Sequence, residues 1–391
     1  MSVMKSINET VKDDELYPKD EKIEEPQSPQ YYSTLAEALS STAPAGSTVK
    51  PIGFDNAEIF LRAGYRTVER DQDVTVVRGG ETEFAAARKE ALSSKLIVVP
   101  THDYAAAATS RYRAESKAFA RMKEGALPHA AVFDANELNE NAASIFGELI
   151  ALDMCAYDMT FASRMRGESV DVETPQRVAH LLSSATDKLR TREKDRRHVE
   201  EVLTEAGKTA AKIVEECPKL LHCSGAAQTY EAHRMLCRAE NRQLGMRGET
   251  EAVICFAVCD FYIKNITDNS FRFPPDNARR IDSVCEYFGA DIRCAAIYAD
   301  PIYPPIKMRL YEYRRNEFRA EITKLLAGVK SRQAAAVQVF KRLYPDDGYG
   351  VRSLVDKTDL PLCLALAPDV FAGDSMLSFL KQTGKLEEYI V

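Results

Sequence analysis

Residues 307–319 read Lys307-Met-Arg-Leu-Tyr-Glu-Tyr-Arg-Arg-Asn-Glu-Phe-Arg319, a stretch in which cations lie among aromatic residues. Apolar and long side chains recur here at steps of three and four, so the spacing predicts a helix with one face toward a core. Cations bind phosphates, and aromatic rings give bases a surface to stack on. The stretch therefore predicts either an amphipathic helix with a solvated basic face or a helix that contacts nucleic acid. The residues assigned to contact are Lys307, Arg309, Tyr311, Arg314, Arg315 and Arg319.

The chain has 391 residues and a net charge of -7, with 45% apolar residues. This length allows two or three domains with substantial cores. The acidic balance excludes a uniformly basic nucleic-acid coat, so any nucleic-acid site needs its cations gathered in one groove. The longest apolar run, from Ala252 to Cys259, is too short to span a bilayer, and no membrane partner is expected.

A second basic cluster interrupts the longest helical pattern, residues 175–216. The apolar seam on either side keeps a spacing of three and four, while the charged block breaks it. We expect two helices, or one helix that crosses an open cleft, with a solvated face full of internal ion pairs as the alternative. The cations assigned to this cluster are Lys188, Arg190, Arg192, Lys194, Arg196 and Arg197.

A third basic segment, residues 103–124, is rich in alanine and also reads as a helix. Three of its cations fall at spacings that put them near one face, and two aromatic residues lie among them. This segment is a weaker candidate for nucleic-acid contact, with a solvated helix face as the alternative. Its assigned residues are Arg111, Arg113 and Lys117.

Strand-like sequence is concentrated in residues 73–100, where Asp73–Arg78 and Lys95–Pro100 are short apolar runs. The first run is followed by Gly79-Gly80 and a helical stretch, as in a phosphate-binding turn. The pattern lacks a third glycine and a Lys-Ser or Lys-Thr pair, so a plain tight turn is the preferred interpretation.

The predicted fold is mainly α: two helical lobes around a basic cleft, with a minor β element near residues 73–100 and terminal arms. The expected parts are an N-terminal arm (1–35), an N-terminal lobe (36–245), a C-terminal lobe (246–372) and a C-terminal arm (373–391). Residues 1–30 carry many charges and too few apolar side chains to fold alone, which favours either a disordered tail or an arm that orders on a neighbour.

No catalytic signature is found among the motifs for hydrolases, metalloproteases or P-loop proteins, so the chain is not expected to be an enzyme. The cysteines and histidines between Cys217 and Cys237 do not have a standard zinc spacing. We therefore predict no catalytic residues, no metal site and no cofactor.

The length, the helical two-lobe layout and the terminal extensions resemble the nucleoproteins of non-segmented negative-strand RNA viruses, in particular those of mymonaviruses. The resemblance covers the chain in outline and rests on no sequence motif. It implies a homo-oligomer, in rings or helical filaments, that encapsidates single-stranded RNA in a basic cleft and polymerises through its arms. It further implies a viral polymerase and a phosphoprotein-like cofactor as partners, and a location in the virion nucleocapsid and the host cytoplasm.

Two other classes stay open at this point. One is a capsid or scaffold protein of another RNA virus, in which contact with RNA is incidental. The other is an enzyme that uses the 73–103 region, where strand ends and turns could form a site.

Overall fold

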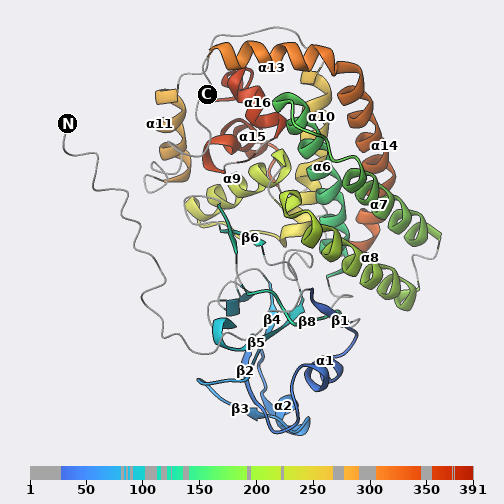
Figure 1. Ribbon diagram of the computed structural model, residues 1–391. Coiled ribbons are helices and arrows are strands. Elements are labelled where there is room, and N and C mark those ends of the chain that lie inside the picture. The colour runs from blue at the N-terminus through green and yellow to red at the C-terminus, as the bar shows by residue number, and fades with distance from the viewer. Residues whose placement is uncertain are drawn as a thin grey trace.

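The structure is a computed structural model in which fifteen stretches of the chain are described. These are residues 28–80, 83–84, 87–88, 91–101, 112–115, 121–124, 126–134, 141–191, 195–221, 224–266, 277–289, 305–344, 355–371, 373 and 375–390. Figure 1 shows a sheet at the bottom of the molecule and a body of helices above it.

The first third of the described chain forms a parallel sheet. The strands are β1 (Gln30–Tyr32), β2 (Thr48–Ile52), β3 (Arg66–Thr67), β4 (Val74–Gly79), β5 (Lys95–Pro100) and β8 (Ala130–Val132). They lie in the order β1-β8-β5-β4-β2-β3, and each neighbouring pair is parallel. Two helices, α1 (Leu35–Thr42) and α2 (Glu58–Arg62), and a 3-10 turn, η2 (Ala91–Ser93), connect them.

The sheet is buried on both faces, as expected for parallel strands. Successive side chains of a strand point to opposite faces. Val77 and Val98 belong to the large core shared with the helical body, whereas Val76 and Val99 belong to a smaller core with α1 and α2. The sheet is thus the middle layer between two small helices and the helical body.

The helical body starts at residue 142. Its helices are α6 (Ala142–Arg166), α7 (Glu173–Thr191), α8 (Arg196–Glu216), α9 (Gly225–Ala239), α10 (Arg247–Ile266), α11 (Asn277–Phe288), α13 (Pro305–Glu317), α14 (Arg319–Leu343), α15 (Asp359–Val370) and α16 (Met376–Gln382), with short turns η3 (Pro218–Leu221) and η6 (Glu387–Tyr389). Helix α6 is the central element and is buried over most of its length.

Two glycines allow α6 and α10 to cross with their backbones in contact. A Cβ on Gly147 would lie 2.1 Å from the carbonyl oxygen of Gly248, and one on Gly248 would lie 2.0 Å from that of Ser144. A side chain at either position would push the two helices apart. The crossing fixes the centre of the body directly above the sheet.

The predicted fold class is wrong. A six-stranded parallel sheet among the described residues takes the place of a minor β element, and a sheet layer with a helical body takes the place of two helical lobes. The reason is physical: strands buried on both faces are short and show no alternation of polar and apolar residues, so their sequences resemble helix or loop.

The third basic segment was also predicted wrongly as a helix. Its described residues form β6 (Tyr112–Glu115) and β7 (Arg121–Glu124), which pair antiparallel as a two-stranded ribbon. Alanine-rich sequence favours a helix in isolation, but cross-strand pairing overrides a weak local preference.

The C-terminal residues, predicted as an arm, pack inside the body. Leu377 and Leu386 are fully buried, and Ile390 is nearly so. Arg279 of α11 donates a hydrogen bond to the carbonyl oxygen of Ile390 at 2.9 Å. The other predicted boundaries stay predictions, and residues 1–27 lie outside the described residues.

Among the described residues, no helix is both long enough and apolar enough to cross a bilayer.

Candidate functional site at the carboxyl edge of the sheet

The strand order has a reversal between β2 and β4. The chain leaves β2 toward β3 on one side, and it leaves β4 toward β5 on the other side. The connections that follow the two strands therefore diverge, and a crevice opens at their carboxyl ends. In open α/β sheets, ligands bind in this crevice.

Gly53 sets the shape of the loop after β2. Its φ of +76° lies in the left-handed region, and a Cβ placed on it would lie 1.9 Å from the carbonyl oxygen of Arg78. Only glycine permits both the conformation and this approach. The loop can therefore turn tightly against the end of β4 and bring Asp55 and Asn56 to the carboxyl edge.

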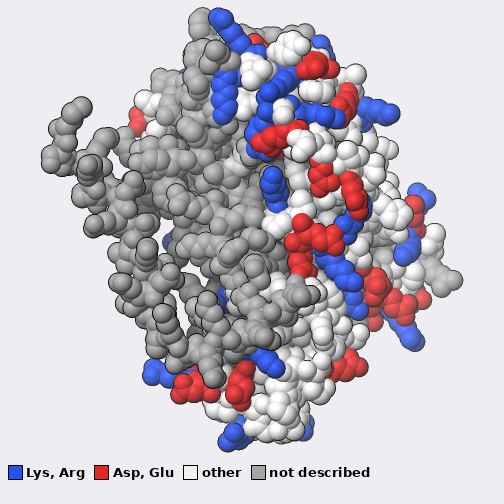
Figure 2. Space-filling view, viewed as in Figure 1, with Lys and Arg blue, Asp and Glu red and all other residues white. Residues whose placement is uncertain are grey.

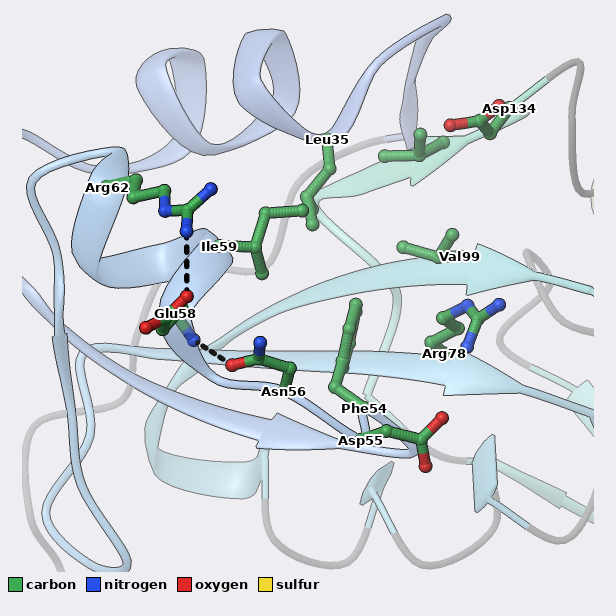
Figure 3. A pocket seen from close by; sticks show the side chains of 11 residues that line it. Leu35, Phe54, Asp55, Asn56, Glu58, Ile59, Arg62, Arg78, Val99 and Asp134 are labelled. Carbon is green, nitrogen blue, oxygen red and sulfur yellow. Dashed lines mark hydrogen bonds and ion pairs between the residues drawn. The ribbon is translucent and has the colours of Figure 1, made fainter.

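A groove with a volume of about 530 Å³ lies at this edge. Its floor is apolar, with Val99 and Val132 from the sheet, Leu35 from the start of α1 and Ile59 from α2 (Figure 3). Phe54 packs edge-on against Phe60, with ring centroids 5.1 Å apart, and forms one wall. A flat apolar group of the size of a nucleobase fits such a floor.

Three charged side chains border this floor, each from a different strand end. Asp55 follows β2, Arg78 ends β4 and Asp134 follows β8 (Figure 3). Asp55 is exposed to solvent. The groove thus offers two carboxylates and a guanidinium to the polar parts of a ligand.

Helix α2 borders the outer side of the groove, and polar side chains at its start are paired with one another or with its backbone. The Asn56 side chain accepts the backbone N–H of Glu58 at 2.8 Å, and Arg62 forms an ion pair with Glu58 at 2.8 Å. Both charged side chains of that pair are largely exposed. These contacts lie within α2 and the turn before it and support the helix locally.

The turn after β4 holds a carboxylate. Gly79 has a φ of +143°, and the backbone N–H of Gly80 donates to Oε2 of Glu83 at 3.0 Å. A Cβ on Gly79 would meet the Glu83 side chain at 2.8 Å. Backbone N–H groups in such a turn can bind an anion, and in this structure the anion is the chain's own glutamate.

On the side of the helical body, the carboxyl end of β5 is joined to the start of α6. The side chain of Asn141 donates to the carbonyl oxygen of Thr101, and both residues are buried. One turn into α6, Ser144 and Glu148 are also buried. The Asn141 side chain therefore joins the end of β5 to the start of α6, while the side chain of Ser144 lies against Gly248 of α10.

No group of three or more His, Cys, Asp or Glu side chains that could hold a metal ion occurs among the described residues. Cys237 and His233 belong to the Cys and His residues of 217–237, for which no zinc site was predicted. Their side chains approach each other, with 3.6 Å between Sγ and Nε2. Burial raises the pKa of the Cys237 thiol and lowers that of the His233 imidazole. Both groups are thus held neutral, while His222 and Cys223 lie outside the described residues.

Residues of the first basic stretch, in α13 and the start of α14, are largely committed to the fold. Arg314 donates to the carbonyl oxygen of Met165 at 2.9 Å, and Arg315 is buried with its guanidinium 5.8 Å from the ring of Phe379. Tyr311 is buried, and the Lys307 ammonium lies 5.6 Å from its ring. Arg309 is exposed, and Arg319 opens α14.

The second basic cluster has the solvated helix face that was its alternative. Arg196 and Arg197 start α8 and pair with Glu200 and Glu201 of the same helix, at 3.4 and 3.2 Å. Arg190, in the last turn of α7 with Lys188, pairs with Asp187 at 3.5 Å. Arg192 and Lys194 lie outside the described residues.

The two clusters do not face each other. Figure 1 places α13 along the top of the body and the ends of α7 and α8 at its right-hand side. On the visible face, acidic and basic side chains are interleaved where α7 and α8 lie (Figure 2). Of the third cluster, Arg113 lies in β6, whereas Arg111 and Lys117 lie outside the described residues.

Comparison with known proteins supports the α/β architecture. No family model matches the chain, and no curated protein matches it. An archaeal halo-thermophilic Red Sea brine pool alcohol dehydrogenase aligns with a TM-score of 0.52 and 13% identity, covering 96% of this chain and all of that one. A 1,3-propanediol oxidoreductase aligns with a TM-score of 0.51 and 12% identity, covering 95% and 99%.

These alignments show that the fold, a parallel sheet followed by a helical domain, is similar to that of the two oxidoreductases. They overturn the prediction of a non-enzymatic viral nucleoprotein that encapsidates single-stranded RNA. The partners that depended on it, which are single-stranded RNA, a viral polymerase and a phosphoprotein-like cofactor, are wrong as well. The contact roles given to individual cations and the predicted virion or cytoplasmic location are tested by no finding.

The groove residues were missed from the sequence. Asp55 and Asp134 are single acidic residues after strands that had not been recognised, so their position at one edge was not visible. The available signal was Gly79-Gly80 after a predicted strand, which lies beside the groove but was interpreted as a plain turn.

Proposed function

We propose that this protein is an oxidoreductase that binds a nicotinamide dinucleotide across the carboxyl edge of its sheet and acts on a small hydroxyl or carbonyl compound. The observation that carries the proposal is the groove at the strand reversal between β2 and β4. It lies where open α/β sheets bind nucleotides. The full-length likeness to an alcohol dehydrogenase and a propanediol oxidoreductase supports the same class.

The groove suits the adenosine half of the dinucleotide. The base would lie on the apolar floor formed by Val99, Val132 and Ile59. Asp55, exposed at the end of β2, would accept hydrogen bonds from the ribose hydroxyls, a role that acidic residues at strand ends take in dinucleotide sites. A carboxylate there repels a 2′-phosphate, so we expect NAD to be preferred to NADP.

The diphosphate would lie over the turn after β4, where the N–H of Gly80 is directed toward an acceptor. Glu83 holds this position and would have to swing away. Its carboxylate is half-buried on a flexible side chain, so a change of rotamer suffices. The site therefore fits the cofactor on the condition that Glu83 moves.

When bound, the nicotinamide ring supplies a hydride acceptor or donor, so that an alcohol is converted to a carbonyl compound with release of one proton. The protein's part is to hold the two reactants together and exclude water. Asn141, buried at the start of α6 and bonded to the end of β5, lies on the side of the helical body from which a substrate would approach.

A resident metal ion such as iron or zinc finds no cluster of three His, Cys, Asp or Glu ligands among the described residues. The buried polar side chains at the start of α6 are an amide, a hydroxyl and a single carboxylate, which do not make a site for such an ion. No step is therefore assigned to a metal.

The binding test uses the fluorescence of NADH, excited at a wavelength that the aromatic side chains of the protein do not absorb. We expect saturable enhancement by the wild type and binding about tenfold weaker in Asp55→Asn, the effect of one hydrogen bond to a charged group. Asp187→Asn, an exposed carboxylate on α7, is the matched control and should bind as the wild type does.

A second measurement tests the chemistry. Reduction of NAD is followed at 340 nm with a panel of primary alcohols and diols, and oxidation of NADH with the matching aldehydes. Turnover that falls in Asp55→Asn but not in Asp187→Asn supports the proposal. Failure of NADH, NAD and NADP to bind at millimolar concentration would refute it.

A further inference from the structure

A second cavity lies in the helical body, away from the sheet. It has a volume of about 410 Å³ and opens between α6, α7 and α14, which lie side by side (Figure 1). Its walls are largely apolar, and two of its rim residues, Val172 and Leu325, are exposed to solvent at 57% and 37%. Pockets of this size and character bind small molecules.

One end of the cavity carries a buried ion pair. The guanidinium of Arg332 donates through Nε and Nη2 to the carboxylate of Asp153, at 2.8 to 3.0 Å. Asp153 is 1% exposed, whereas the Arg332 side chain is 26% exposed. The charge of the buried Asp153 carboxylate is thus balanced by Arg332, whose more exposed guanidinium lines the cavity.

The third nitrogen of that guanidinium is available to a ligand. Among the described residues, Nη1 of Arg332 has no hydrogen-bond acceptor. It lies one turn from Gly328, where a Cβ would approach it to 3.3 Å. Because Gly328 has no side chain, the path from the cavity to Nη1 stays open.

The two other carboxylates around the cavity are already engaged by the fold. Glu321 accepts two hydrogen bonds from Arg164, at 3.0 and 2.7 Å. Asp171 accepts the backbone N–H groups of Glu173 and Thr174 and so offsets the positive end of α7. Lys324, exposed one turn before Gly328, is left as a second cation at the opening.

We propose that this cavity binds a small monocarboxylate with an apolar body, such as a medium-chain or aromatic acid. The carboxylate would accept from Nη1 of Arg332 and lie near the Lys324 ammonium, while the apolar body would pack against Tyr157, Val329 and Leu325. A neutral oxygen could accept from Nη1 but would lack the charge that strengthens the bond, and a cation would place a second positive charge beside the guanidinium. The site is independent of the groove at the sheet.

The test is calorimetric titration of the full chain with sodium octanoate, with octanol and octylamine as probes that share its apolar body. We expect octanoate to bind with a stoichiometry of one and at least tenfold more tightly than either comparison compound. Equal binding of octanol would overturn the assignment of a carboxylate, and preferred binding of octylamine would overturn it as well. No binding of octanoate at millimolar concentration would refute the site.

Two variants locate the binding. Ala179→Phe introduces a ring from the α7 wall and should abolish binding of octanoate. Lys324→Ala should weaken it about fivefold, the size expected for one partly exposed charge. Lys341→Ala, an exposed lysine near the end of the same helix, is the matched control and should have no effect. Undiminished binding to Ala179→Phe, with its helix content verified by circular dichroism, would refute the location.

Discussion

Gly53 lies so close to Arg78 that a Cβ on Gly53 would be 1.9 Å from the Arg78 carbonyl oxygen. We therefore expect Gly53→Ala to lower the free energy of unfolding by about 2–4 kcal/mol, since it adds a backbone clash to a left-handed φ. Gly46 has a φ of +91° but nothing within 4 Å of its Cβ position. Gly46→Ala should lose only about 1 kcal/mol. Equal losses of unfolding free energy for the two variants in urea denaturation would show that the close approach to Arg78 does not contribute to the effect.

Glu83→Gln tests the anion site in the turn after β4. The amide oxygen can still accept from Gly80, but the negative charge that opposes a diphosphate is removed. If the proposed cofactor binds there, NADH affinity should rise about fivefold at low salt, and the gain should shrink as salt screens the charge. Glu201→Gln on the surface of α8 is the control. Weaker binding by Glu83→Gln would mean that the glutamate takes part in holding the ligand.

The buried network around Arg280 predicts a large loss of stability. Arg280 is fully buried and donates to Asp369 and Glu387, while Lys381 pairs with Asp369 at 2.9 Å. Removing one charge leaves the others uncompensated, so Arg280→Met should lower the free energy of unfolding by about 3–5 kcal/mol. Arg197→Met, which breaks an exposed pair on α8, should leave the midpoint of denaturation unchanged. A similar result for both variants would contradict this account.

Asp158 predicts a pH dependence of stability. Burial raises the pKa of its carboxyl to about 7, although N–H donors from Met376 and Gly225 and the Tyr262 hydroxyl favour the charged form. The folded chain then retains a proton that the unfolded chain releases near pH 4. The stabilisation from this group is complete below pH 4 and is lost as pH rises through 7.

We therefore expect the free energy of unfolding of the wild type to contain a component that falls between pH 5 and 7 by at most about 1 kcal/mol per pH unit. Asp158→Asn should lack this component while being less stable throughout, since an amide cannot accept all three donors. Urea denaturation at several pH values measures both. Parallel pH profiles for wild type and variant would show that Asp158 stays charged.

Part of the sheet could be predicted from sequence. Strands β4 and β5 were expected within a residue of their bounds, because each contains at least three consecutive β-branched residues. Strand β8 is only Ala-Ala-Val, and β1 pairs with it across a hundred residues of chain. A three-residue strand carries too little periodicity to be recognised, and its pairing depends on contacts that a local pattern does not contain.

Strand β2 was hidden by its own composition. It contains Lys50 and Pro51, and proline removes a hydrogen-bond donor from a strand. The structure accommodates this because β3 pairs only with Thr48 and Val49, so the sheet has narrowed before Pro51 is reached. The groove was missed for the same reason, because without β2 the sequence does not place Asp55 at the end of a strand.

The basic stretch 307–319 was interpreted as a binding surface because arginine can either bind phosphate or hold parts of the fold together. Arg314 and Arg315 hold α13 to the rest of the body through a carbonyl oxygen and an aromatic ring. A guanidinium that caps a helix end and one that binds phosphate look the same in sequence. Only the tertiary neighbours distinguish them.

The bond between Asp158 and the backbone N–H of Met376 joins residues 218 positions apart. During synthesis α6 leaves the ribosome early, and the rest of the helical body must be made before the Asp158 carboxylate can accept the N–H of Met376. Until then the apolar sides of α6 and α9, which α15 and α16 cover in the finished body, are open to solvent and to other chains. Slow translation over residues 267–370 would lengthen that exposure, so the yield of soluble protein during synthesis should depend on chaperones that bind nascent chains.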